Sequence, residues 1–146
     1  MKTDTTSLII SQREGNLDRL RPVVETLGSA VRGARSCAEA SRVLSNDPSI
    51  LLVLTDSHLP DGNWMDVMDL AARAREKVNV VVVSPGVDIC LYIEVMNQGA
   101  YDFIAADFTV SEVVHVVRLA LDNARQARVK PFVARSTLAR LKGATA

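Results

Sequence analysis

Short apolar runs alternate with helix-like segments along most of the chain. Apolar runs typical of buried strands occupy residues 8–10, 50–55 and 78–83, and weaker runs occupy residues 30–33 and 101–105. Between them, apolar residues recur three and four positions apart, which predicts helices over residues 17–27, 36–46, 64–74, 89–96 and 111–128. Five strands that alternate with five helices favour an α/β doubly wound parallel sheet with helices on both faces.

Residues that begin or end helices mark several boundaries. Gly28 and Gly99 follow the first and fourth helical patterns and are suited to C-terminal caps. Ser36 and Ser111 precede helical patterns and are expected to be N-caps. Trp64 is expected to anchor the start of the third helix, packed over the mouth of the pocket described next.

The predicted topology gathers a small set of chemically interesting residues. In a parallel α/β sheet the functional crevice lies beyond the carboxyl ends of the strands. Five residues fall at these ends, namely Ser11, Gln12, Asp56, Ser84 and Ala106. Asp56 is the most informative, because a lone carboxylate where a buried strand opens into a loop is well placed for chemistry.

The spacing of these residues resembles that of response-regulator receiver domains, over about residues 7–127. Receivers carry a phosphoacceptor Asp at the end of the third strand and a Pro four residues later, matched here by Asp56 and Pro60. They also carry a Ser or Thr after the fourth strand and an aromatic switch on the fifth, matched by Ser84 and Phe103. The resemblance implies a flavodoxin-like fold with strand order 2-1-3-4-5.

Other positions depart from the receiver pattern. Ser11 and Gln12 stand where the family has an acidic pair that helps to bind a divalent cation, and Ala106 stands where it has a lysine. Mg²⁺ prefers anionic oxygen ligands, so we expect no cofactor and at most weak Mg²⁺ binding. Asp107 would repel a phosphoryl group, and Glu14 is the one candidate for a substitute acid.

Each retained residue also has a plainer interpretation. Asp56 could cap the loop that follows it, and Ser84 before Pro85-Gly86 is equally suited to a turn. Phe103 is also a normal core residue. His58 and His115 lack partners at metal-ligand spacing, although the backbone carbonyl of His58 could still face a residual cation beside Asp56.

Composition excludes several classes of partner. The 146 residues include 17 basic and 17 acidic ones, which gives no overall field to attract nucleic acid or an anionic membrane. Cys37 and Cys90 are too few for a disulfide framework or a metal knuckle. With no signal peptide and no apolar run of membrane-spanning length, the chain is expected to be cytoplasmic.

Two regions are expected, a receiver-like domain over residues 1–128 and a basic C-terminal extension or linker over residues 129–146. The extension combines basic and apolar residues with Pro131, so it is either a solvated linker, an arm that docks a partner or touches nucleic acid, or the connection to an output domain. Nucleic-acid binding is not expected from this domain alone.

Three functions are compatible with the sequence, and none makes the chain an enzyme with catalytic residues. We favour a pseudo-receiver that binds a protein partner, or itself as a homodimer, through its fourth helix, fifth strand and fifth helix. The helix near residues 88–98 supports this hypothesis, because its apolar residues surround more of the circumference than one buried face requires. The first alternative is a conventional regulator phosphorylated on Asp56 by a histidine kinase. An FMN or nucleotide binder is the weakest alternative, since residues 11–15 contain a single glycine.

Overall fold

The computed structural model describes residues 5–12, 14–105 and 107–129, with the side chains of residues 14–18 excepted. A five-stranded parallel sheet has the order β2-β1-β3-β6-β7, which is the predicted order with a small hairpin numbered between the third and fourth long strands. The strands are β1 (Thr6–Ile10), β2 (Ala30–Ala34), β3 (Ile50–Asp56), β4 (His58–Leu59), β5 (Gly62–Asn63), β6 (Asn79–Ser84) and β7 (Asp102–Ala105). The helices are α1 (Glu14–Thr26), α2 (Cys37–Asn46), α3 (Trp64–Ala72), α4 (Ile89–Asn97) and α5 (Val110–Val129).

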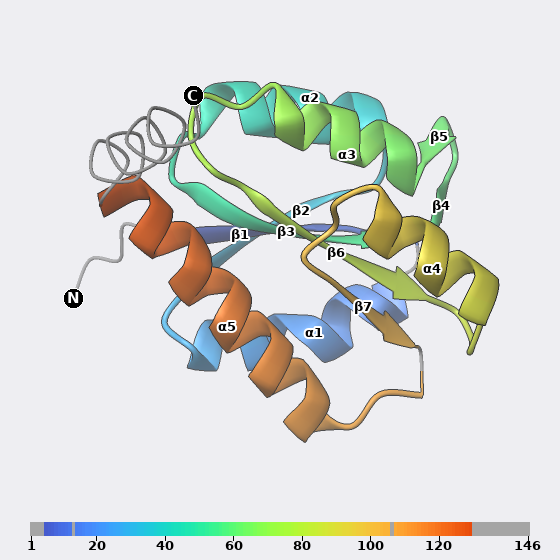
Figure 1. Ribbon diagram of the computed structural model, residues 1–146. Helices are drawn as coiled ribbons and strands as arrows, with labels where there is room; N and C mark the ends of the chain where they lie inside the picture. Colours follow the sequence, from blue (N-terminus) through green and yellow to red (C-terminus); the bar gives the residue numbers. More distant parts are fainter. Residues whose placement is uncertain (1–4, 13, 106, 130–146) are drawn as a thin grey trace, which may run out of the picture.

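The helices cover both faces of the sheet. Figure 1 shows α1 and α5 on one side and α2, α3 and α4 on the other. Alternation along the strands divides the core accordingly: Ile9 packs with the α1 and α5 side, while Leu8 and Ile10 pack with the other side. Trp64 is buried in the second cluster at the start of α3, which confirms its predicted role as a helix anchor.

Helix boundaries follow the predicted caps with one exception. Gly28 and Gly99 adopt positive φ angles of 87° and 93°, and Ser36 accepts a hydrogen bond from the Glu39 amide at 3.1 Å. The prediction of Ser111 as the N-cap of the last helix is wrong. Thr109 takes this role, because its hydroxyl accepts a hydrogen bond from the Glu112 amide at 3.2 Å.

The sequence did not predict the antiparallel hairpin of β4 and β5 that follows Asp56. The hairpin leads into α3 through Asn63, whose side chain accepts from the Met65 amide while Asp66 accepts from the Asn63 amide. This reciprocal capping box fixes the start of α3.

Arg128 joins the end of α5 to two connections at the amino edge of the sheet. Its guanidinium donates to the carbonyl oxygens of Pro48 and Ile50, both at 2.6 Å, and to that of Lys77 at 3.3 Å. Burial lowers the pKa of the Arg128 guanidinium, and the nearby Glu76 carboxylate opposes that change. The three carbonyls therefore hold the last turn of α5 against the rest of the domain.

Replacing Arg128 with Met keeps an aliphatic side chain and removes every donor. We expect Arg128→Met to lower the free energy of unfolding by about 2 kcal/mol, since hydrogen bonds from a charged group are lost and carbonyls lose their partner. Urea unfolding followed by circular dichroism measures the change. Arg118→Met, at an exposed position of the same helix, should change stability by less than about 0.5 kcal/mol. Equal losses in both variants would contradict the assigned role.

Candidate functional site

The strand register brings Ser11, Asp56 and Ser84 to the carboxyl edge of the sheet. Ile10 pairs with Thr55, so Ser11 and Asp56, the next residues, lie side by side. Asp56 pairs with Val83, and Ser84 follows on the same strand. This arrangement is the one predicted from the sequence. Ala106 lies outside the described residues, and Glu14 is described only through its backbone at the start of α1.

Asp56 is held by uncharged donors from the first loop. The Ser11 hydroxyl donates to Asp56 Oδ2 at 2.8 Å, and the Gln12 amide N–H donates to the same oxygen at 3.3 Å. Ser11 is buried, whereas Asp56 is half-buried. These contacts join β1 to β3 at their carboxyl ends, so at least one oxygen of the carboxylate has a structural role in addition to any chemical one.

Ser84 is bonded within its own loop. Its hydroxyl donates to the Gly86 carbonyl at 2.7 Å and accepts from the Gly86 amide at 3.3 Å, and the side chain is buried. This is the geometry of a serine turn, which agrees with the plainer of the two interpretations of the sequence. A change of partner by this hydroxyl would require both contacts to break.

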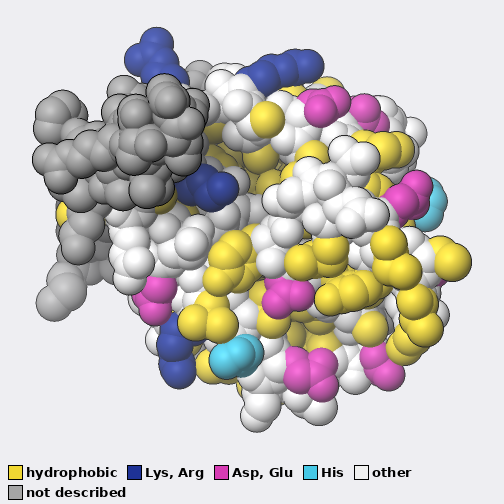
Figure 2. All heavy atoms as spheres, viewed as in Figure 1, with side chains coloured by type: hydrophobic (Ala, Val, Ile, Leu, Met, Phe, Trp, Pro, Cys, Tyr) yellow, Lys and Arg dark blue, Asp and Glu magenta, His cyan; other side chains and the backbone are white. Residues whose placement is uncertain are grey.

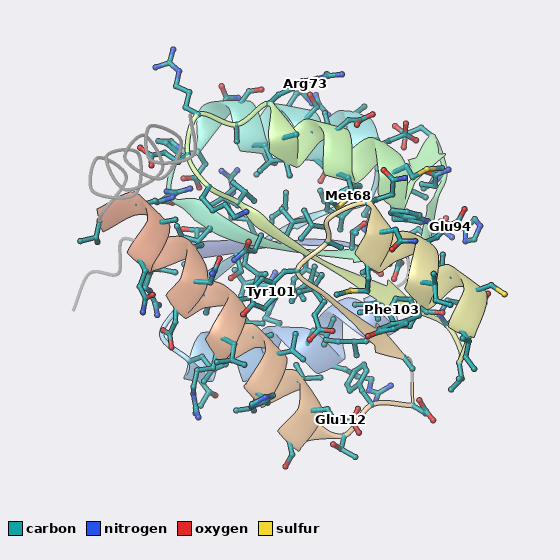
Figure 3. All side chains as sticks on the ribbon, in the orientation of Figure 1. Met68, Arg73, Glu94, Tyr101, Phe103 and Glu112 are labelled. Carbon is teal, nitrogen blue, oxygen red and sulfur yellow. The ribbon has the colours of Figure 1, made fainter. Side chains whose placement is uncertain are left out.

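Phe103 lies half-buried on β7 and meets a ring of α4. The rings of Phe103 and Tyr92 are 5.6 Å apart and inclined at 84°, an edge-to-face arrangement. Figure 3 shows Phe103 beside α4. The aromatic predicted as a switch therefore connects β7 with the outer surface of α4 in this conformation.

The described residues offer little to a metal ion. Within them no group of three His, Cys, Asp or Glu side chains lies close enough together to hold one. His58 is exposed, and its Nδ1 lies 3.2 Å from the Ser57 hydroxyl. With Ser11 and Gln12 beside Asp56, the donor set does not fit the anionic oxygen site that Mg²⁺ prefers.

Asp61 is a structurally important residue that the sequence analysis missed. Its carboxylate leaves the β4–β5 turn and accepts from the amides of Cys37 at 2.7 Å and Ala38 at 3.0 Å, at the start of α2. These bonds hold the pKa of Asp61 below its ordinary value. The Pro60-Asp61-Gly62 sequence indicated a turn, but nothing local to it indicated that the partner would be a helix 24 residues away.

The same contact leaves little room around Gly62 and Cys37. A Cβ on Gly62 would overlap the Asp66 carboxylate and lie 3.0 Å from Cys37 Sγ. Burial, with the nearby Asp61 and Asp66 carboxylates, raises the pKa of the Cys37 thiol to about 11. The thiol is therefore protonated at neutral pH and packs as a small apolar group.

The chain is similar to parts of several curated response regulators, although no protein-family model matches it. It is 27% identical to the photosynthetic apparatus regulatory protein RegA of Cereibacter sphaeroides, over 78% of this chain and 61% of that protein. It is 27% identical to TodT of Pseudomonas putida, over 77% of this chain and 52% of that protein. The matches therefore span about half to three fifths of these relatives.

Solved structures share the fold at lower identity. The receiver domain of a LuxO-type repressor from Vibrio parahaemolyticus has a TM-score of 0.77 at 17% identity, over 86% of this chain and 95% of that chain. A CheY-like receiver domain from Methanospirillum hungatei has a TM-score of 0.73 at 20% identity, over 84% and 97%. The receiver domain dimer of beryllofluoride-activated NtrC4 has a TM-score of 0.74 at 18% identity, over 82% and 98%. The receiver fold predicted from the sequence is confirmed.

Acid should weaken the hydrogen bonds between the hairpin and α2. The pKa of Asp61 is lower in the folded state, so its stabilisation is fully present above the unfolded value of about 3.9 and is lost as pH falls through the folded value. We expect the urea midpoint of the wild type to fall more between about pH 6 and pH 3 than that of Asp61→Asn. Asp69→Asn, an exposed position on α3, should keep the wild-type profile. Parallel profiles for wild type and Asp61→Asn would contradict the assignment.

Proposed function

We propose that this chain, a receiver domain of the two-component response-regulator type by sequence relatives and fold, acts as a pseudo-receiver that binds protein partners without being phosphorylated. Its curated relatives are response regulators and its structural neighbours are receiver domains. One observation carries the proposal: the carboxylate of Asp56 meets a hydroxyl and an amide N–H where a magnesium site needs further anionic oxygens. The site thus keeps a carboxylate at the position of the family's phosphoacceptor, with a serine and a glutamine at the positions of its acidic pair.

Charge neutralisation is the main requirement that this pocket fails. Phosphoryl transfer depends on positioning and on cations that stabilise the charge of the transferred group. Ser11 and Gln12 bring no negative charge to bind a divalent cation, and the sequence has Ala106 in place of the family's lysine. The exposed carboxylate of Asp107, next in the chain, would repel a phosphoryl group. These features favour a signalling module that does not depend on phosphate at Asp56.

Exposed apolar side chains support a docking role. We call the surface of Ile89, Tyr92 and Ile93 on α4, Phe103 on β7, and Val116 and Leu119 on α5 the α4–β7–α5 face. Ile89 is 69% exposed and Ile93 is 52% exposed, while Val95 on the opposite side of α4 is fully buried. Contiguous exposed apolar area on a folded domain usually marks an interaction site, either for a partner or for a second copy. None of the described helices combines the length and apolarity needed to cross a membrane.

A conventional regulator, phosphorylated on Asp56 by a histidine kinase, is the second candidate. It is favoured by the half-buried position of Asp56 at the carboxyl edge, where a phosphodonor could approach. The two proposals differ in whether metal binds beside Asp56 and whether the carboxylate accepts a phosphoryl group.

We expect Mg²⁺ to bind more weakly than about 10 mM, because one carboxylate without a second acid is a poor magnesium site. Ser11→Asp combined with Gln12→Asp should tighten binding by about tenfold or more, since it restores anionic oxygens next to Asp56. Isothermal titration calorimetry measures both affinities, with Asp69→Asn as a control on a remote helix. Low-millimolar or tighter affinity in the wild type, lost in Asp56→Asn, would overturn the expectation.

Acetyl phosphate with Mg²⁺ should not label the protein appreciably. Ser11 and Gln12 stand where the family has its cation-binding acids and Ala106 where it has its lysine, so modification is expected to stay well below one phosphoryl group per chain. Intact-mass spectrometry measures the labelled fraction, and Asp56→Asn gives the background. Stoichiometric labelling at Asp56 would instead establish the conventional regulator.

A further inference from the structure

The α4–β7–α5 face has a charge pattern as well as an apolar one. Residues 78–117 contain five acidic residues and neither Lys nor Arg. These acids are Asp88, Glu94, Asp102, Asp107 and Glu112. Figure 2 shows hydrophobic side chains over α4 and β7 with acidic ones among them, and Lys and Arg side chains beyond α5 and over α2 and α3.

Two side-chain contacts fix the rotation of α5 against this face. Asn123 meets Asn79 of β6 at 3.0 Å, whereas Arg125 donates to Thr5, next to β1, at 3.3 Å. Helical spacing places Glu112, Val116 and Leu119 on the flank of Asn123, toward β6 and β7. It places Arg118 on the flank of Arg125, toward β1. The basic side chains of this part of α5 thus lie away from the face.

Two of the acids, Asp102 and Glu112, lie beside the apolar residues of the face. Asp102 is half-buried at the start of β7, beside Phe103, and Glu112 is exposed at the start of α5. Figure 3 shows Glu112 at that helix start, whereas Glu94 lies on the edge of α4 away from β7. Asp88 caps α4 by accepting from the Leu91 amide at 3.0 Å. An approaching partner therefore meets apolar side chains with the carboxylates of Asp102 and Glu112 beside them.

This pattern argues against a second copy as the occupant. In a two-fold symmetric dimer the same patch faces itself, so the carboxylates of one copy would find no basic residue of the face on the other. Like charges brought together in an interface cost free energy. The same field opposes nucleic acid and anionic lipid surfaces.

We infer that the α4–β7–α5 face binds a basic amphipathic helix of a partner protein, with apolar side chains against Tyr92 and Ile93 and Lys or Arg side chains against Asp102 and Glu112. This inference rests on the docking role proposed above and specifies the chemistry of the partner. Helix-in-groove recognition supplies apolar anchors at one helical face, and charge complementarity supplies the orientation and excludes wrong partners.

The probe is a fluorescent amphipathic helix of Leu and Lys, about 14 residues long, with a twin in which Glu replaces Lys. Fluorescence anisotropy with the full chain measures binding. The Leu/Lys peptide should bind, more weakly at high salt, and the Leu/Glu twin should not. Asp102→Lys with Glu112→Lys should weaken binding at least about tenfold. The control is Glu25→Lys with Asp69→Lys, which changes the net charge by the same amount at exposed positions of α1 and α3. This control should weaken peptide binding less than about threefold.

The outcomes separate the inference from the docking role. Suppose that Ile89→Ser with Ile93→Ser abolishes peptide binding, but the two double Lys variants weaken it equally. The face is then a docking site, and the inference of a basic partner is wrong. If the apolar pair has no effect, the docking role of the face fails as well. If light scattering finds a dimer that Ile93→Glu dissociates, the occupant is a second copy and the inference is overturned. Thermal unfolding of each variant verifies that the domain remains folded.

Discussion

The hydrogen bond from the Ser11 hydroxyl to the Asp56 carboxylate determines the character of the carboxyl edge of this domain. At this position a second carboxylate would repel Asp56 unless a cation lay between them. Here the Ser11 hydroxyl and the Gln12 amide N–H both donate to Asp56 Oδ2 and so join β1 to β3. These two contacts link the first and third strands at the edge where the sequence predicted the pocket.

Polar side chains of the neighbouring loops also form hydrogen bonds within the domain. The Ser84 hydroxyl is bonded to Gly86, and Asp61 ties the loop after Asp56 to the start of α2. Each contact uses a polar group that could otherwise face a ligand. Together they favour one conformation of the edge, and the exposed apolar side chains of α4 remain available in that conformation.

The sequence was sufficient for the main sheet and for the residues at its edge, because largely apolar strands and helical spacing are strong local signals. It was less informative about features that depend on tertiary contacts, such as which residue caps a helix. Thr109 rather than Ser111 caps α5, since both are capping residues and only the packed position of the helix selects one. The role of Asp61 depends on a helix distant in sequence. Periodicity showed that α4 has too many apolar residues, but not that Ile89 and Ile93 would be the exposed ones. The predictions for Ala106 and for the 130–146 extension fall on residues outside the described part of the chain.

The contacts of Arg128 reach the central strand of the sheet. The guanidinium grips the carbonyl of Ile50, the first residue of β3, and Asp56 is the last residue of that same strand. The same side chain therefore links the last turn of α5 to the strand that ends in the candidate phosphoacceptor. Since β3 is paired on both sides, with β1 and with β6, a contact at Ile50 and the carboxylate of Asp56 stand at opposite ends of the central strand of the sheet.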